Sequence, residues 1–309
     1  MPALAHENVG DLVELTLNQY IKTDYVSLTT DLTDHHFAKQ MIRKKRMASQ
    51  GGTHFNWKYE MNTGDSFSQI DMSSPDAAEI YDAFESMQVE FKKREVKYAL
   101  LKEMVDFNKG PERLVDIAKP KESGIDKDWI EGIENEGWAF PSVANTKNIY
   151  SIPFWVTKAS TVGFNGGLPS GYTTKAGLSP TTWPRLNNYS GNYTSVTLDD
   201  LIDKMRTMFE VTNFKPMTPS EGKLGQRGDR ALYTKLSVKK SFADVADSRN
   251  DNLGPDVAKM DGEVTFKGAT LNYVPKLDLD STGPIYMLDW GTFLTVIKKV
   301  NYRTYHGFI

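Results

Sequence analysis

The sequence predicts an α+β fold, in which helices and short strands occupy separate stretches of one chain. Residues 53–61 alternate apolar with polar side chains, which is the period of a strand with one apolar face. Residues 198–209 carry apolar side chains at helical spacing, and residues 266–302 contain runs of β character separated by proline and glycine turns. Both kinds of element are therefore expected in one fold.

Composition limits the classes of protein to which the chain can belong. Its 309 residues are enough to bury roughly 75% of the unfolded surface, in one large domain or two ordinary ones. Hydrophobic residues make up 39% and the mean hydropathy is -0.48, which indicates an elongated chain or a surface that meets a partner. The formal net charge of -3 gives the whole chain no electrostatic reason to coat nucleic acid, so any such contact is expected to be local.

The sequence also argues against disulfides, thiolate metal sites and membrane insertion. It contains no cysteine, which suits a reducing compartment. The first ten residues lack a basic region followed by an apolar core, and no run approaches the ~18 apolar residues of a membrane helix. We therefore expect a chain that stays soluble in the cell that makes it.

The first 50 residues contain a helical pattern, a polar stretch and a basic run. Residues 7–20 place apolar side chains on one helical face, whereas residues 21–39 have no sustained period and predict an arm that lies on another surface. The basic run consists of Arg43, Lys44, Lys45 and Arg46. Two interpretations of it are open, a solvated surface patch or a docking site for an acidic neighbour.

Residues 53–61 predict a strand, and residues 62–65 then turn the chain. The apolar side chains on one face of this strand are Phe55, Trp57, Tyr59 and Met61. Because a two-stranded projection is barely stable alone in water, this aromatic face is expected to need a further surface.

A second strand is expected over residues 87–101, after a short helix over residues 75–84. A helical alternative exists at the junction, because four apolar side chains there also fit helical spacing. They are Ile80, Phe84, Met87 and Phe91. The two strands and the long excursion between them predict an extended loop.

A helix is expected to open at Pro111, since proline at the first helical position and an acid in the first turn are both favourable. Proline inside a helix removes a hydrogen bond, so Pro120, followed by Ser123 and Gly124, predicts a break or kink. The helix is expected to resume at Asp126. Further along, residues 149–156 predict a strand with aromatic side chains.

Two helices are expected in the C-terminal half. The clearer one covers residues 198–209, with Thr197 as its cap and with Asp199 and Asp200 in the first turn, where the helix dipole favours anions. A capping role explains the position of these aspartates better than a role in acid–base catalysis does. The second helix is expected over residues 229–246. Polar loops are expected on either side of it, at residues 212–228 and 250–261.

The C-terminal stretch predicts strands over residues 269–274 and 285–288, the latter continuing into residues 293–297. Pro275 and the Ser-Thr-Gly-Pro turn at residues 281–284 separate them. Together with the sequence TTWPRLNN at residues 181–188, this pattern resembles the coat proteins of tailed bacteriophages. In that family, strands joined by a turn such as Lys-Gly and by a loop rich in Pro and Asp close the chain. The resemblance is to a major capsid protein of the Hong Kong 97-type fold.

This resemblance implies a division of the chain into four parts. They are an N-terminal arm (1–52), an extended loop (53–101), a peripheral domain with a spine helix (102–160 and 262–309) and an axial domain (161–261). It also implies a structural protein that builds an icosahedral shell around double-stranded DNA. No catalytic residue, cofactor or metal is expected.

The implied partners are other copies of the chain, in the pentamers and hexamers of a shell. A separate scaffolding protein, a portal and decoration proteins are further expected partners, with non-specific contact to packaged DNA and none to membrane. The expected location is the virion capsid, assembled in the cytoplasm of a host bacterium. The candidate subunit-interface residues are Arg43, Lys44, Lys45, Arg46, Phe55, Trp57, Tyr59 and Met61.

A search for catalytic or ligand-binding motifs yields weak patterns. His35 and His36 lie near two aspartates, but adjacent rings in a strand point apart. The glycine-rich residues 163–167 lack the Gly-Lys-Ser/Thr of a phosphate loop. Asp278 and Asp280 resemble the paired acids of some sugar transferases, although acids in a loop that contains proline are usually solvated turn residues.

Two other functions stay open beside the phage shell. A related one is a nanocompartment shell that encloses a cargo enzyme, as encapsulins do. The other is a carbohydrate-active enzyme, in which Trp and Tyr side chains stack on the substrate and paired aspartates act as acid and base. The enzyme alternative predicts a monomer or small oligomer with a concave acidic pocket, whereas the shell predicts large closed assemblies.

Overall fold

The computed structural model describes residues 35–42, 47–50, 52–61, 84–97, 118–212, 230–247, 264–293 and 295–298. Helices and short strands are mixed within these residues, which confirms the α+β prediction. The α-helices are α2 (His36–Ile42), α4 (Ala118–Trp138), α5 (Ile152–Trp155), α6 (Asp203–Thr212) and α7 (Leu236–Asp247). None of the described helices is both long and apolar enough to cross a membrane.

The described strands form small sheets. The strands are β1 (Met47–Gln50), β2 (His54–Glu60), β3 (Phe84–Glu90), β4 (Gly163–Gly166), β5 (Asn188–Ser190), β6 (Arg230–Thr234), β7 (Thr265–Phe266), β8 (Ala269–Tyr273), β9 (Ile285–Asp289) and β10 (Thr295–Lys298). Three pairs stand alone, β1 with β10 in parallel and β2 with β3 and β4 with β5 antiparallel. The remaining four strands form one sheet in the order β7-β8-β6-β9.

The chain divides into two compact units, one of residues 1–38 and 94–134 and the other of residues 39–93 and 135–309. In the first unit, the backbone N–H of Ala38 donates to the buried carboxylate of Glu134 at 2.8 Å. Because the first N–H groups of a helix have no partner within it, this carboxylate satisfies one of those of α2.

The four-stranded sheet forms the core of the second unit. Its central strand β6 runs parallel to β8 and antiparallel to β9. One face of the sheet packs against α6, α7 and the π-helical turn η3 (Leu198–Ile202). The buried residues of this cluster are Leu201, Ile202, Met205, Leu232, Phe242, Phe266, Ala269 and Leu271.

Aromatic rings cover the other face of the sheet. Trp138, the last residue of α4, lies with its ring centroid 5.0 Å from Tyr233 and 6.2 Å from Tyr286. Trp290 donates its indole N–H to the Tyr233 hydroxyl at 2.7 Å, which satisfies two buried polar groups. Strand β6 is therefore apolar on both faces, as a buried central strand must be.

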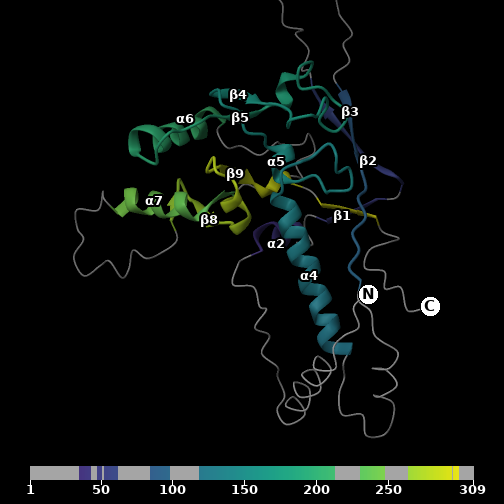
Figure 1. Cartoon of the computed structure of the whole chain (residues 1–309). Helices are drawn as coiled ribbons and strands as arrows, with labels where there is room; N and C mark the ends of the chain where they lie inside the picture. The colour runs from purple at the N-terminus through teal and green to yellow at the C-terminus, as the bar shows by residue number, and fades with distance from the viewer. Residues whose placement is uncertain are drawn as a thin grey trace, which may run out of the picture. The chain divides into compact units, whose positions relative to one another are not determined.

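The predicted break at Pro120 is wrong. Figure 1 shows α4 as one uninterrupted helix from Ala118 to Trp138, running through Gly124. Pro120 is the third residue of α4 as the structure describes it, and the first four N–H groups of a helix have no intrahelical acceptor. Within the described part of α4, proline at this position therefore interrupts no hydrogen bond. The helical prediction from residue 126 onward is confirmed.

Three predicted elements have a different structure. Residues 152–155 form the helical turn α5 rather than a strand, because Pro153 suits the start of a helix and Val156 N–H bonds to Ile152 at 2.8 Å. The proposed helix over residues 229–246 begins with strand β6 and becomes helical only at Leu236. The arm predicted to end at residue 39 gives way to α2, in which Phe37 and Ala38 are buried.

Other predictions are confirmed with shifted ends. The second strand of the hairpin, β3, starts three residues earlier than expected and ends at Glu90, and the strand alternative prevails over the helical one. The predicted continuation of this strand is wrong over residues 91–97, which form no strand. β8 and β9 match their predictions, whereas β10 begins two residues later than expected, after the turn η5 (Trp290–Thr292). The helix predicted over residues 198–209 is present as η3 and α6.

Several predictions lie outside the described residues. They concern the helix over 7–20, the polar stretch up to residue 34, the basic run 43–46, the turn at 62–65, the helix over 75–83, the helix start at Pro111 and most of the two loops 212–228 and 250–261.

Candidate functional site

The β2–β3 hairpin has one aromatic face and one polar face. The strands pair without a bulge, from His54 opposite Glu90 to Glu60 opposite Phe84. On the aromatic face, the Trp57 ring centroid lies 5.2 Å from that of Phe55 and 6.1 Å from that of Tyr59. On the polar face the exposed β2 side chains are Asn56, Lys58 and Glu60. The predicted alternation of apolar and polar side chains along this strand is confirmed.

The aromatic face packs against residues of the same chain. Its Trp57 lies 6.4 Å from Trp155 between ring centroids. The cluster joins buried Met61, Met87 and Ala176 to half-buried Trp57, Tyr59, Val89, Trp155, Leu178, Trp183 and Leu186. The surface that the hairpin was expected to need is thus supplied, in part, by residues 155–186.

A tight turn at residues 175–178 holds the edge of β3. Lys175 and Leu178 exchange backbone hydrogen bonds of 2.7 and 3.1 Å. Ala176 and Gly177 both adopt positive φ, 51° and 92°, as a turn of type I′ requires. The Ala176 carbonyl accepts the N–H of Gln88 at 2.9 Å, which places the turn along the outer side of β3.

Lys175 buries its amine beside this turn. The side chain is 3% exposed, and its Nζ donates to the Trp155 carbonyl at 2.7 Å. Burial lowers the pKa of Lys175 to about 8, because a charged amine is poorly stabilised away from water. Lys175 therefore binds the backbone of Trp155, and the free-energy cost of burying its charged amine depends on pH.

A small charged group lies at the base of the hairpin. Lys92 donates to the Glu90 carboxylate at 2.9 Å, and His54 lies 3.8 Å from the same carboxylate. The hydrogen bond and charge of Lys92 lower the pKa of Glu90. The Lys92 amine also lies 5.6 Å from the centre of the Tyr150 ring. Because Glu90 is exposed, this group orients side chains and adds little stability.

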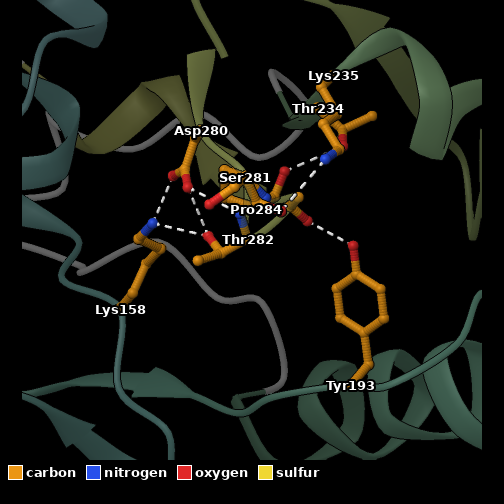
Figure 2. A network of polar contacts seen from close by, with 9 residues as sticks. Lys158, Tyr193, Thr234, Lys235, Asp280, Ser281, Thr282 and Pro284 are labelled. Carbon is orange, nitrogen blue, oxygen red and sulfur yellow. Dashed lines mark hydrogen bonds and ion pairs between the residues drawn. The ribbon is translucent and has the colours of Figure 1, made fainter. Parts of the chain in front are cut away.

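The turn at residues 280–284 collects polar contacts from distant parts of the chain (Figure 2). Lys158 donates to the Asp280 carboxylate and, at 2.9 Å, to the Thr282 hydroxyl. Tyr193 donates its hydroxyl to the Gly283 carbonyl. Thr234, the last residue of β6, donates to the Pro284 carbonyl at 3.0 Å. The turn thereby connects segments that are up to 124 positions apart in sequence.

Asp280 is ionised at the centre of this network. Its side chain is 7% exposed, and burial alone opposes ionisation. The hydrogen bonds from Lys158 and Thr282 outweigh burial and hold the pKa of Asp280 below its ordinary value. The sequence-based view of Asp280 as a solvated turn residue is wrong, because Lys158 reaches it from a distant segment.

Asp278 has a separate structural role. Its carboxylate accepts the N–H of Leu236, the first residue of α7, at 3.0 Å and the Tyr273 hydroxyl at 2.6 Å. An acceptor at a helix N-terminus satisfies one of its unpaired N–H groups. Both aspartates of this segment therefore bind protein groups.

Asp200, in the first turn of the helix at residues 198–212, binds the segment that leads into the helix, and the predicted cap by Thr197 is wrong. Thr197 makes no side-chain capping bond. The Asp200 carboxylate accepts the N–H groups of Thr194 and Ser195, both at 2.7 Å, and pairs with Lys204. The bond from Lys204, followed by these two, lowers the pKa of Asp200 well below its usual range.

The structure brings together part of the predicted interface set. Phe55, Trp57, Tyr59 and Met61 lie on one face of the hairpin, whereas the basic run at residues 43–46 is outside the described residues. Sequence reasoning missed Lys175 and Lys158, because a single lysine in a loop carries no signal of the distant group to which it binds. Within the described residues, no group of three or more His, Cys, Asp or Glu side chains is placed to hold a metal ion.

Comparison with known proteins gives a match in structure rather than in sequence. No protein-family model and no curated protein matches the chain. A chain of the cyanophage A-1(L) capsid asymmetric unit superposes on it with a TM-score of 0.62 at 14% sequence identity. This chain has a phage-capsid-like fold. The match covers 87% of this chain and 74% of the cyanophage chain, so it extends well beyond a single motif. The resemblance inferred from residues 266–302 is thus supported at the level of the fold.

Proposed function

We propose that this chain is a major capsid protein of the Hong Kong 97-type fold. Many copies would assemble into the icosahedral shell around the double-stranded DNA of a tailed bacteriophage. The fold shared with a chain of the cyanophage capsid asymmetric unit is the observation that supports the proposal most strongly. It implies a structural protein rather than an enzyme.

The properties of the chain suit a shell built from many modest contacts. A projecting hairpin that buries a few hundred square ångströms on a neighbour contributes several kcal/mol at ~25 cal/mol per Å², before the cost of ordering. Repeated around a closed shell, such contacts give a durable container. The low mean hydropathy of -0.48 agrees with a surface whose contacts are completed by partners.

The proposed layout follows the parts expected from the sequence. Residues 1–52 form the arm, 53–101 the extended loop, 102–160 and 262–309 the peripheral domain with α4 in its spine helix, and 161–261 the axial domain. Strand β6 pairs with β8 and β9, so the boundary at residue 261 runs between strands of one sheet. The division therefore describes two lobes that share a sheet.

The proposed partners are other copies in pentamers and hexamers, a separate scaffolding protein, a portal, decoration proteins and non-specifically bound DNA. Assembly takes place in the host bacterial cytoplasm, and the product is the virion capsid. The aromatic face of the hairpin and the basic run 43–46 remain the proposed contacts between subunits. In the described chain, the aromatic face already packs on residues 155–186, so a neighbour would contact its remaining exposed part.

The proposal is tested by the size and shape of the purified protein. Light scattering after size exclusion, followed by negative-stain electron microscopy, should show closed shells or rings of five and six subunits, alone or with a co-expressed scaffold. A stable monomer under all these conditions would contradict the proposal. Shells that contain protein and no DNA would support the nanocompartment alternative instead.

A further inference from the structure

Strand β4 ends in Asn165 and Gly166, the one place where the sequence has asparagine directly before glycine. The Asn165 side chain is exposed to solvent. Its amide donates to the Val162 carbonyl at 3.1 Å, a contact within the same short segment. The side-chain carbonyl carbon of Asn165 is therefore accessible both to water and to the next nitrogen of the backbone.

A β-bulge takes Asn165 out of the regular ladder between β4 and β5. Gly163 pairs with Ser190 at one end of the ladder. Gly166 pairs with Asn188 at the other end, so β4 has one residue more than β5 between the two pairs. Such an extra residue is left unpaired and disrupts the ladder locally. The backbone of Asn165 is therefore less constrained than that of a residue in a regular strand.

The peptide group of Gly166 lies in a tight turn. The Asn165 carbonyl accepts the N–H of Gly167 at 2.9 Å, which closes a turn centred on Gly166. A Cβ at position 166 would lie 2.2 Å from the Nδ2 atom of Asn188, so the fold requires glycine here. The same lack of a side chain leaves the Gly166 nitrogen unshielded. The packing of Asn188 thus keeps at this position the residue that hinders attack on Asn165 least.

We propose that Asn165 is a site of spontaneous deamidation through a cyclic imide with Gly166. The Gly166 nitrogen bonds to the Cγ atom of Asn165, while the bond from Cγ to Nδ2 breaks and ammonia leaves with the proton of the Gly166 N–H. Water then opens the imide at either carbonyl. Opening at the side-chain carbonyl gives aspartate, and opening at the main-chain carbonyl gives isoaspartate. Water is the only co-reactant.

Isoaspartate at position 165 changes the backbone as well as the charge. The chain then runs through the former side chain, which lengthens β4 by one carbon atom and displaces Gly166 from Asn188. The Asn188 amide exchanges hydrogen bonds of 2.9 Å with the N–H and C=O of Thr157. Deamidation therefore weakens the contact that holds the segment before Lys158. This inference is independent of the proposed function, since any folded copy of the chain carries the site.

The test is mass spectrometry of the full-length folded chain after incubation in mildly alkaline buffer. The peptide with Asn165 should gain the mass difference between an amide and an acid about tenfold or more faster than that with the exposed Asn145, because threonine follows Asn145. Fragmentation that cleaves beside the inserted carbon should identify isoaspartate among the products. Digestion at mildly acidic pH and a sample without incubation control for deamidation during preparation.

The matched variants are Asn165→Gln and Asn165→Asp. Glutamine keeps the amide, but its attack by the next nitrogen forms a larger and less favoured ring, so this variant should keep its mass and its thermal stability on incubation. Aspartate adds the charge without the extra backbone atom. Incubated parent chain enriched in isoaspartate should therefore unfold at a lower temperature than Asn165→Asp.

Three results would count against the proposal. If Asn165 reacted no faster than Asn145 in the folded chain, although it reacted in urea, the fold would protect the site and the proposal would be overturned. Aspartate formed without isoaspartate would overturn the route through the cyclic imide. Isoaspartate formed without loss of thermal stability would overturn the effect on Asn188.

Discussion

At the scale of single residues, two buried charged groups hold segments that are distant in sequence. Asp280 joins the 280–284 turn to Lys158, and Lys175 joins its own turn to the Trp155 carbonyl. Both groups are nearly inaccessible to water, with exposed fractions of 7% and 3%. Their ionisation is therefore coupled to folding, and because both pKa values are lowered in the fold, each group makes stability rise with pH, Asp280 at acid pH and Lys175 at alkaline pH.

Asp280→Asn should destabilise the fold by on the order of 1–3 kcal/mol near neutral pH, because it leaves Lys158 without its charged partner. The folded pKa of Asp280 is lowered, so its contribution is present above the unfolded pKa and is lost as the pH falls through the folded one. Urea unfolding at about pH 7 and about pH 3 should show a smaller difference between variant and parent at acid pH. The exposed Asp199→Asn serves as the control, and an equal effect of both variants would contradict this role of Asp280.

Lys175→Met should abolish a rise of stability at alkaline pH. The amine has a pKa of about 8 in the fold against an ordinary value of 10.5, so between these values the unfolded chain binds more protons and the folded state gains stability as the pH rises. The gain in the parent chain should be on the order of 1–3 kcal/mol by urea unfolding, and it should be missing in the variant. If the stability of the variant rose at alkaline pH as much as that of the parent chain, a group other than Lys175 would be responsible for the rise.

At the scale of elements, the β4–β5 pair depends on a glycine that faces an amide side chain. Asn188 exchanges hydrogen bonds of 2.9 Å with the N–H and C=O of Thr157, much as a strand would. Its amide occupies the space beside Gly166, where a Cβ would lie 2.2 Å from Nδ2. The absence of a side chain at Gly166 therefore permits Asn188 to hold the segment that leads to Lys158.

Gly166→Ala should destabilise the fold by about 1–3 kcal/mol or more, since the added methyl group would overlap the Asn188 amide. Gly132→Ala is a suitable control, because a Cβ in this part of α4 would meet no described atom within 4 Å. It should leave stability unchanged or raise it by about 0.5–1 kcal/mol. Thermal unfolding of both variants measures the contrast, and a neutral Gly166→Ala would indicate that Asn188 can move aside.

At the scale of the whole molecule, the hairpin connects the stability of a subunit to its proposed assembly. Trp57 contacts Phe55, Tyr59 and Trp155, so the same ring orders the hairpin and shapes the surface offered to a neighbour. The sequence predicted an interface role for this ring, whereas the structure adds an internal one. The interface role remains a prediction.

Trp57→Ala should reduce the yield of shells while the sheet core, which the ring does not contact, remains folded. Loss of its half-buried ring should cost about 1–3 kcal/mol in the docking of the hairpin. Light scattering measures assembly, and hydrogen exchange at β2 and β3 measures docking. Lys58→Ala, on the polar face of the same strand, is the control. Normal shells from the Trp57 variant would remove this residue from the proposed interface.

The residues of a segment by themselves determined its secondary structure where the hydrophobic periodicity fits only one kind of element, a strand or a helix. β2 alternates strictly, the helix at residues 198–209 keeps one apolar face, and β8 and β9 are bounded by turns, so each was predicted from its own residues. The closing pattern of strands also led to the phage-capsid resemblance, which the shared fold supports.

Tertiary structure decided the rest, because the deciding partners lie far along the chain. Residues 230–234 became the central strand since β8 and β9 supply ladders on both sides, and a strand with two apolar faces has no period to read. Asp280 is a buried ion because Lys158, which lies 122 positions away in sequence, pairs with it. The aromatic face of β2 was predicted to need a cover, but only the fold shows that residues 155–186 of the same chain provide part of it. Burial and pairing are properties of two segments at once, and a sequence pattern describes one segment at a time.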